Sequence, residues 1–201
     1  MLAQTRSGKS YLIRHGILPI VPNARIVLID VKPGGERTWA GWGNDVESLS
    51  RGFGRGPNGN ANYRVMLQSG TRGKDQIQRV IDIISTEGEV IFIMDDSRKI
   101  TANNPGLGLR NHVDALLTDG AGIGISVILA ANSTVWATST LRDQCGVYFL
   151  GLMTNADQRK QFANIIGLPK EYHPTLATLK PRQFLYCDQF DGPQRLALTN
   201  L

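Results

Sequence analysis

The chain has 201 residues, of which 41% are hydrophobic and 19% charged, and it carries a formal net charge of +5. This length suits one well-buried domain, expected to span residues 1–201, and no run comes near the roughly 18 consecutive apolar residues of a membrane span. These properties exclude an integral membrane segment. Without a signal peptide they predict a cytoplasmic protein, whose basic charge suits a nucleotide or a nucleic acid. Cys145 and Cys187 are expected to be buried thiols.

The chain opens with a pattern typical of a phosphate-binding loop. Residues 3–10 (AQTRSGKS) fit G-x-x-x-x-G-K-[ST], with Ala3 in place of the first glycine. Backbone N–H groups of such a loop cradle a di- or triphosphate, the lysine reaches the β- and γ-phosphates, and the hydroxyl residue ligates Mg²⁺. The alternative is a glycine turn with a surface lysine. The residues expected to bind the nucleotide are Arg6, Ser7, Gly8, Lys9, Ser10 and Tyr11, with Ser10 also on the metal.

A buried strand ordinarily leads into such a loop, whereas only Met1 and Leu2 stand before it here. We therefore expect the first strand of the sheet to be missing, as in a truncated or mis-started chain. The loss of a central strand would leave sheet edges exposed. It predicts weakened stability and nucleotide affinity.

After the loop, the first half of the chain predicts a helix, a strand and an irregular segment. Lys9–Leu18 is expected to be helical and to end near Pro19. Arg25–Val31 is an apolar run rich in β-branched residues, typical of a buried strand. Glycines crowd residues 34–62 and disfavour a regular packed element there, and Tyr63–Leu67 predicts the next strand.

The second half alternates helices and strands. Helical periodicity predicts helices at Lys74–Ser85, around residues 109–117, and at Asp157–Ile166, which Gly167 closes. Short apolar runs predict strands at Glu89–Met94, Ile123–Ala131 and Cys145–Leu150. Residues 184–187 and 195–198 predict a terminal hairpin. This alternation indicates an α/β fold with a mostly parallel sheet between layers of helices.

Polar residues stand at the ends of three of these strands. In parallel sheets ligands bind beyond the carboxyl ends of the strands, so Asp30, the pair Asp95-Asp96, and Asn132 are expected near the phosphate loop. Asp95 suits Mg²⁺, Asp96 suits a general base, and the Asn132 amide suits a γ-phosphate or its attacking water. The alternatives are two solvated acids in a strand-end turn and an Asx-turn at Asn132.

An arginine finger for a neighbouring subunit has three candidates. Arg142 is favoured and Arg110 comes next, ahead of Arg98, although each also suits a surface ion pair. Residues 51–59 mix arginines, a phenylalanine and glycines, which suits either contact with a nucleic-acid backbone or a plain solvated loop. Trp39 and Trp42 suit either a cover for the nucleotide base or packing.

Taken together, these motifs resemble the FtsK/HerA superfamily of P-loop DNA-pumping ATPases. Gly8–Lys32 is similar to the first helix and second strand of that group, including the I-D-x-K ending. Val90–Asp96 (VIFIMDD) resembles its Walker B strand, where D-E is the commoner ending. Gly124–Asn132 (GISVILAAN) resembles its sensor strand, with Asn132 in the place of a glutamine. The resemblance implies the P-loop ATPase fold, with ATP and Mg²⁺ as cofactors.

A bare domain of this size is most similar, within that superfamily, to genome-packaging ATPases of tailless, membrane-containing double-stranded DNA viruses, including the archaeal turreted ones. That resemblance implies a homo-oligomeric ring, pentameric or hexameric, which threads double-stranded DNA and receives an arginine in trans. It further implies capsid or membrane-vertex partners, in the host cytoplasm or the virion. The alternatives are a conjugation or segregation motor, a nucleotide-binding module without turnover, and a small-molecule kinase.

Overall fold

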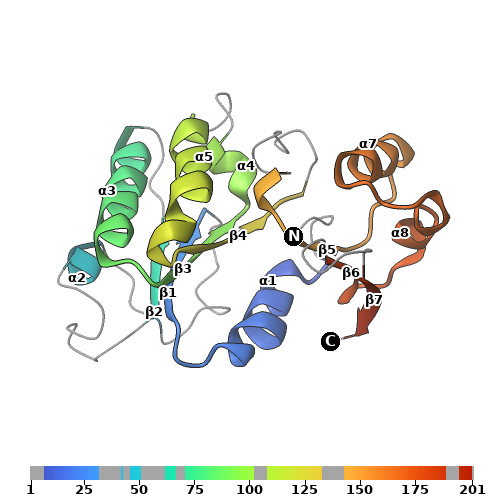
Figure 1. The fold of residues 1–201 in the computed structure, drawn as a ribbon, viewed down its shortest axis with the longest axis horizontal. Coiled ribbons are helices and arrows are strands. Elements are labelled where there is room, and N and C mark those ends of the chain that lie inside the picture. The colour runs from blue at the N-terminus through green and yellow to red at the C-terminus, as the bar shows by residue number, and fades with distance from the viewer. Residues whose placement is uncertain are drawn as a thin grey trace. The chain divides into compact units, whose positions relative to one another are not determined.

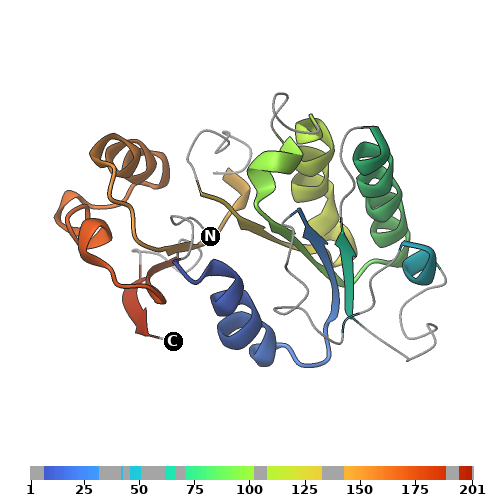
Figure 2. The ribbon, with the colours of Figure 1, turned by 180° about the vertical axis from the view of Figure 1, so that it is seen from behind.

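A computed structural model forms two compact units (Figures 1 and 2). Unit 1 comprises Met1–Ile20 and Ala130–Leu201, and unit 2 comprises Val21–Leu129. The structure describes residues 7–31, 42, 46–50, 62–66, 71–101, 108–132, 143–188 and 195–200. No helix among these residues is both long and apolar enough to cross a lipid bilayer. The expectations for the strand before the loop, for residues 51–59 and for Trp39 lie outside the described residues.

Unit 2 is built on the predicted parallel sheet, whose strand order is β2-β1-β3-β4. Its strands are β1 (Arg25–Asp30), β2 (Asn62–Met66), β3 (Val90–Asp95) and β4 (Ser126–Ala130). β1 pairs in parallel with both β2 and β3. Nearly every residue of β1 and β3 is buried, as expected for strands covered on both faces. The predicted α/β class is confirmed.

The main helices of unit 2 are α3 (Thr71–Glu87) and α5 (Arg110–Asp119), which lie side by side over the sheet (Figure 1). Each buries one apolar stripe, which includes Ile77 and Ile84 in α3 and Val113 in α5. The shorter helix α4 (Ser97–Thr101) follows β3. Both long helices were predicted, and the structure extends α3 by about one turn at its start.

Two sequence predictions for unit 2 need correction. Helix α2 (Val46–Ser50) forms in the glycine-crowded segment. Leu49 is fully buried there, and the burial of its apolar side chain stabilises a local helix. Strand β4 starts later than the predicted Ile123–Ala131, because Gly120–Ile123 (η4) forms a 3₁₀ turn. That turn ends at Gly124, whose φ of 77° is left-handed and incompatible with a strand.

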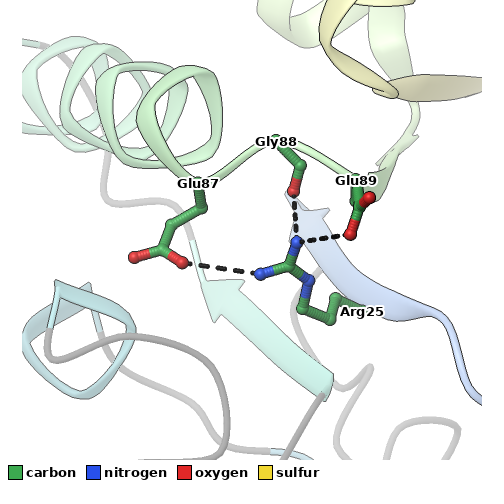
Figure 3. A network of polar contacts seen from close by, with 4 residues as sticks. All are labelled: Arg25, Glu87, Gly88 and Glu89. Atoms are coloured by element: carbon green, nitrogen blue, oxygen red, sulfur yellow. Dashed lines mark hydrogen bonds and ion pairs between the residues drawn. The ribbon is translucent and has the colours of Figure 1, made fainter.

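The amino-terminal ends of β1 and β3 are tied together by Arg25 (Figure 3). Its guanidinium donates to the Gly88 carbonyl at 2.9 Å and pairs with Glu87 at 3.5 Å and Glu89 at 3.4 Å. These contacts fix the turn between α3 and β3 against the start of β1. Because the carboxylates are exposed, the ion pairs stabilise the fold only weakly.

A buried ion pair joins the carboxyl end of β1 to β2. Arg64 of β2 donates from Nε to Asp30 Oδ2 at 3.0 Å, and its Nη2 lies 3.0 Å from the same oxygen. Both side chains are almost fully buried. Sequence reasoning placed Asp30 at this edge but gave Arg64 no role.

Replacing Arg64 by alanine is expected to lower the free energy of unfolding by about 3 kcal/mol or more, because Asp30 would be left as a buried charge without this partner. Urea unfolding measures the loss. Arg72→Ala, on the exposed face of α3, is the matched control and should change stability by less than about 0.5 kcal/mol. Equal effects of the two substitutions would contradict a structural role for the ion pair.

Unit 1 contains a separate antiparallel sheet of order β5-β6-β7. Its strands are β5 (Val147–Leu150), β6 (Gln183–Asp188) and β7 (Arg195–Asn200). The terminal hairpin of β6 and β7 is confirmed. The strand predicted at Cys145–Leu150 is confirmed as β5, which pairs antiparallel with β6 and places Leu150 opposite Leu185. Alternating burial along β5 fits its two differently packed faces.

Helices cover both faces of this sheet. On one face, Tyr148 and Leu185 belong to one apolar cluster with residues of α7 (Ala156–Ile166) and α8 (Thr175–Thr178). Helix α7 starts at Asn155, whose side chain accepts the Gln158 N–H, and it ends at left-handed Gly167, as predicted. The other face packs Phe184 against Leu12 of the helix that follows the loop.

That helix differs from a plain α-helix. It begins as α1 (Lys9–Tyr11), continues as the π-helix η1 (Leu12–Ile17), and ends as the 3₁₀ turn η2 (Leu18–Ile20). Pro19 has no N–H to donate to the carbonyl four residues earlier, so the α-helical hydrogen-bond pattern cannot continue through this residue. The predicted helix from Lys9 is confirmed, with irregular hydrogen bonding that apolar periodicity does not reveal.

Both cysteines of unit 1 are free thiols. Burial raises the pKa of the Cys187 thiol, and the neighbouring Asp188 carboxylate raises it further. Burial likewise raises the pKa of Cys145. Each thiol therefore keeps its proton at neutral pH.

Iodoacetamide, which reacts with thiolates, is expected to label the folded protein slowly at pH 7.5. The rate should rise only above the ordinary thiol pKa of 9.0, since both native pKa values are raised. Mass spectrometry of alkylated peptides measures this, and the urea-unfolded chain is the control. Equal labelling of the folded and unfolded chains at pH 7.5 would contradict the buried, protonated state.

Candidate nucleotide-binding site

The described end of the candidate phosphate loop, Ser7–Ser10, has the backbone that its glycine predicts. Gly8 has a φ of 97°, a left-handed conformation that favours glycine. Its carbonyl accepts the Leu12 N–H at 2.8 Å, which starts the helix directly after the loop. A Cβ on Gly8 would lie 3.1 Å from Arg182 Cγ and 3.3 Å from Arg182 Cα. The glycine is therefore required both by its dihedral angle and by close packing.

Lys9 is the central cation of this loop. Its residue is only 5% exposed, and its Nζ donates to Asn132 Oδ1 at 2.5 Å. Asn132 stands just after the end of β4, 123 positions away along the chain. The structure thus brings together two residues that sequence reasoning assigned to one phosphate site. Burial of an ammonium group is costly unless polar partners hold it, so this contact also positions the amine.

A second polar atom of the loop points to a ligand. Ser7 Oγ is buried and has no hydrogen-bond partner among the described residues. Leaving a buried hydroxyl without a partner costs about 1–3 kcal/mol. A phosphate oxygen is a hydrogen-bond acceptor that such a hydroxyl can donate to. The Ser7 hydroxyl and the Lys9 ammonium therefore fit a phosphorylated ligand. Ser10 is partly buried in the first turn of the helix, where its hydroxyl would serve Mg²⁺.

The other side of the loop carries a contact that sequence reasoning missed. The Arg182 guanidinium lies over the Tyr11 ring, 4.3 Å from its centroid. The Tyr11 and His15 rings lie 4.3 Å apart. The Arg182 N–H also donates to the Ser7 carbonyl at 2.9 Å. The only signal in the sequence was Pro181-Arg182 just before a strand, which marks a turn without indicating its position beside the loop.

The acidic residues belong to unit 2. Asp95 is the last residue of β3, is almost fully buried, and is the register partner of Asp30 in β1. Asp96 follows in a turn with a φ of 66°, a left-handed conformation that aspartate adopts more readily than most residues. Backbone strain of this kind often marks functional positions. The assignment of Asp95 to the metal and of Asp96 to the base stays a prediction.

Of the arginine-finger candidates, the structure describes the side chain of Arg110. Its Nε lies 3.7 Å from Asp114 Oδ2, and the side chain is 56% exposed. Such an exposed pair within one helix is weak, so the guanidinium can exchange this partner for another. Arg6, Arg142 and the side chain of Arg98 lie outside the described residues.

Known proteins resemble this chain in fold but not detectably in sequence. No protein-family model matches the sequence, and no curated protein matches it either. The fold matches solved structures over the whole chain. The genome packaging NTPase B204 from Sulfolobus turreted icosahedral virus 2, in complex with sulfate, is 16% identical with a TM-score of 0.72, covering 100% of this chain and 94% of that one.

Two further structures share this fold. VirB4 of Thermoanaerobacter pseudethanolicus is 10% identical with a TM-score of 0.71, covering 100% of this chain and 88% of that one. EssC (ATPases 2 and 3) from Geobacillus thermodenitrificans is 13% identical with a TM-score of 0.64, covering 99% and 38%. The chain therefore has the fold of these solved structures, and the predicted resemblance is confirmed at the level of the fold.

Substitution of Gly8 by alanine is expected to disturb the loop, because alanine disfavours a φ of 97° and its Cβ would press on Arg182. We expect nucleotide affinity to fall by at least about tenfold, since the close phosphate contacts of the loop need this backbone. Isothermal titration with ATP and Mg²⁺ measures the affinity. Gly122→Ala is the matched control, because a Cβ at Gly122 would meet no atom within 4 Å. Unchanged ATP affinity of the Gly8 variant would contradict the assignment of the loop.

Proposed function

We propose that this protein is an ATP-hydrolysing motor that translocates double-stranded DNA, and that its task is viral genome packaging. The observation that carries the proposal is the buried Lys9 ammonium bonded to Asn132 at the end of β4. A phosphate loop alone occurs in many nucleotide-binding proteins. A polar residue held beside the loop lysine adds a second group that could reach the γ-phosphate or its attacking water. The fold shared with the genome packaging NTPase B204 supports the same proposed function.

The chain's own residues suggest how the site would act. Lys9 would bind the β- and γ-phosphates when nucleotide enters, and the Ser7 hydroxyl would donate to a phosphate oxygen. Lys9 would then exchange or share its contact with the Asn132 amide, which would orient the γ-phosphate or the attacking water. Asp96 would accept the proton of that water. Ser10 and Asp95 would hold Mg²⁺, which neutralises charge that develops on the phosphates.

The proposed partners follow from charge and from the fold. A net charge of +5 suits a polyanion such as double-stranded DNA. A homo-oligomeric ring would let one subunit supply Arg142, or Arg110, to the nucleotide of its neighbour. Capsid or membrane-vertex proteins would dock this ring on the virion. The motor would work in the host cytoplasm or in the virion.

Two other functions remain as alternatives. The shared fold of VirB4 and EssC favours another motor of the FtsK/HerA type, active in conjugation or segregation. A nucleotide-binding module without turnover is the second, because Asp96 replaces the glutamate that is commoner at this position of the motif. Binding of ATP without release of phosphate would favour this module.

Phosphate release from ATP is expected to rise several-fold when linear double-stranded DNA is added, because a translocase couples hydrolysis to movement along its track. Lys9→Ala should abolish both the basal and the stimulated activity by removing the cation at the β- and γ-phosphates. Lys160→Ala is the matched control, since this exposed lysine of α7 belongs to the same unit. Equal hydrolysis with and without DNA would overturn the translocase function, and full activity of Lys9→Ala would overturn the site.

Asn132→Ala is expected to separate binding from hydrolysis. ATP affinity should change by less than about threefold, whereas the rate of hydrolysis should fall by about 10²-fold, as for loss of a donor that acts in the transition state. Titration and single-turnover assays measure the two quantities. If hydrolysis stays at the wild-type rate, Asn132 only caps a turn.

A further inference from the structure

Arg182 occupies a backbone position that ordinarily belongs to glycine. It lies in a turn in which the Gln183 N–H donates to the Lys180 carbonyl at 3.0 Å. Pro181 takes the second position of this turn, and Arg182, with a φ of 68°, takes the third. A proline followed by a residue of positive φ defines a type II turn, whose third position favours glycine. The backbone of an arginine at this position is strained, and strain of this kind is often found at functional residues.

The same turn is attached to the phosphate loop. The Arg182 N–H donates to the Ser7 carbonyl at 2.9 Å, and its Cα and Cγ lie against the open face of Gly8. Its guanidinium lies over the ring of Tyr11, which directly follows Ser10. An aromatic ring under a guanidinium restricts its orientation and leaves its N–H edges free to bind an anion.

The charge of Arg182 is available for a ligand. The residue is exposed, and none of the described carboxylates lies within ion-pair distance of its guanidinium. A surface arginine that only solubilised the protein would need neither the strained turn nor the aromatic contact. A planar guanidinium beside a phosphate loop is suited to bind phosphate oxygens through two parallel hydrogen bonds.

We propose that Arg182 is a second phosphate-binding cation of the nucleotide site, and that it contacts the α-phosphate while Tyr11 positions it. This rests on the proposed nucleotide function of the loop. Lys9 and Ser10 serve the β- and γ-phosphates and their metal ion. The cation held by the next residue, Tyr11, is therefore left for the α-phosphate, which ATP and ADP share.

The key variant is Arg182→Gly, because it removes the guanidinium and relieves the strained backbone together. The melting temperature should stay level or rise by about 2 °C, while affinity for both ATP and ADP should fall by about tenfold, as for one lost charge-assisted hydrogen bond. Glu89→Gly is the matched control, since Glu89 is also a non-glycine residue of positive φ with an exposed charge. It should leave both affinities unchanged.

Three further variants separate charge from shape. Arg182→Gln keeps the strained backbone but loses the charge, and it should weaken nucleotide binding as much as glycine does. Arg182→Lys should retain part of the affinity. Tyr11→Leu should weaken binding in the wild-type background and have no added effect in Arg182→Gly, since the ring acts through the guanidinium.

Isothermal titration with ATP, ADP and Mg²⁺ decides between the outcomes, with Lys9→Ala measured beside the Arg182 variants. Wild-type affinity of Arg182→Gly, with binding lost in Lys9→Ala, would overturn the role of Arg182 and leave the proposed function standing. A loss confined to ATP would overturn the α-phosphate assignment. Failure of the wild-type protein to bind either nucleotide would overturn both the site and this inference.

Discussion

The hydrogen bond between the Lys9 ammonium and the Asn132 amide oxygen joins two segments of unit 1 that lie 123 positions apart along the chain. It holds a buried cation in the phosphate loop and fixes the residue that follows β4. A buried ammonium group is tolerated only where polar atoms replace the lost water. Left-handed Gly8 and the helix that begins at its carbonyl position the residue that carries this amine. Phosphate binding would use the same cation without rebuilding the loop.

In unit 2, an ion pair between Arg64 and Asp30 stabilises a buried carboxylate. Parallel register places Asp30 and Asp95 side by side on β1 and β3, and two neighbouring carboxylates repel each other. Arg64 reaches over from β2 and pairs with Asp30. This pairing offsets the negative charge of one acid beside the position where Asp95 is proposed to hold a metal ion. The Arg64–Asp30 ion pair and the proposed metal-binding Asp95 thus lie at one edge of the sheet.

Backbone strain is found at two positions for which we propose roles. Asp96 and Arg182 both have positive φ, although neither is glycine. The third non-glycine example, Glu89, is explained by a tight turn, in which its N–H donates to the Ile123 carbonyl and its carboxylate pairs with Arg25. At Arg182 the strain accompanies contacts with Ser7, Gly8 and Tyr11, which make the turn before β6 part of the phosphate loop's surroundings.

Local patterns in the sequence determined the loop, the buried strand β1 and the helix α7, because glycine position, apolar runs and caps act over a few residues. They also placed Asp95 at a strand end. Tertiary structure alone decided that β5 joins the terminal hairpin, that Arg64 pairs with Asp30, and that Arg182 lies on Tyr11. Strand partners and side-chain contacts between distant segments depend on how apolar faces pack, which periodicity along one segment does not specify.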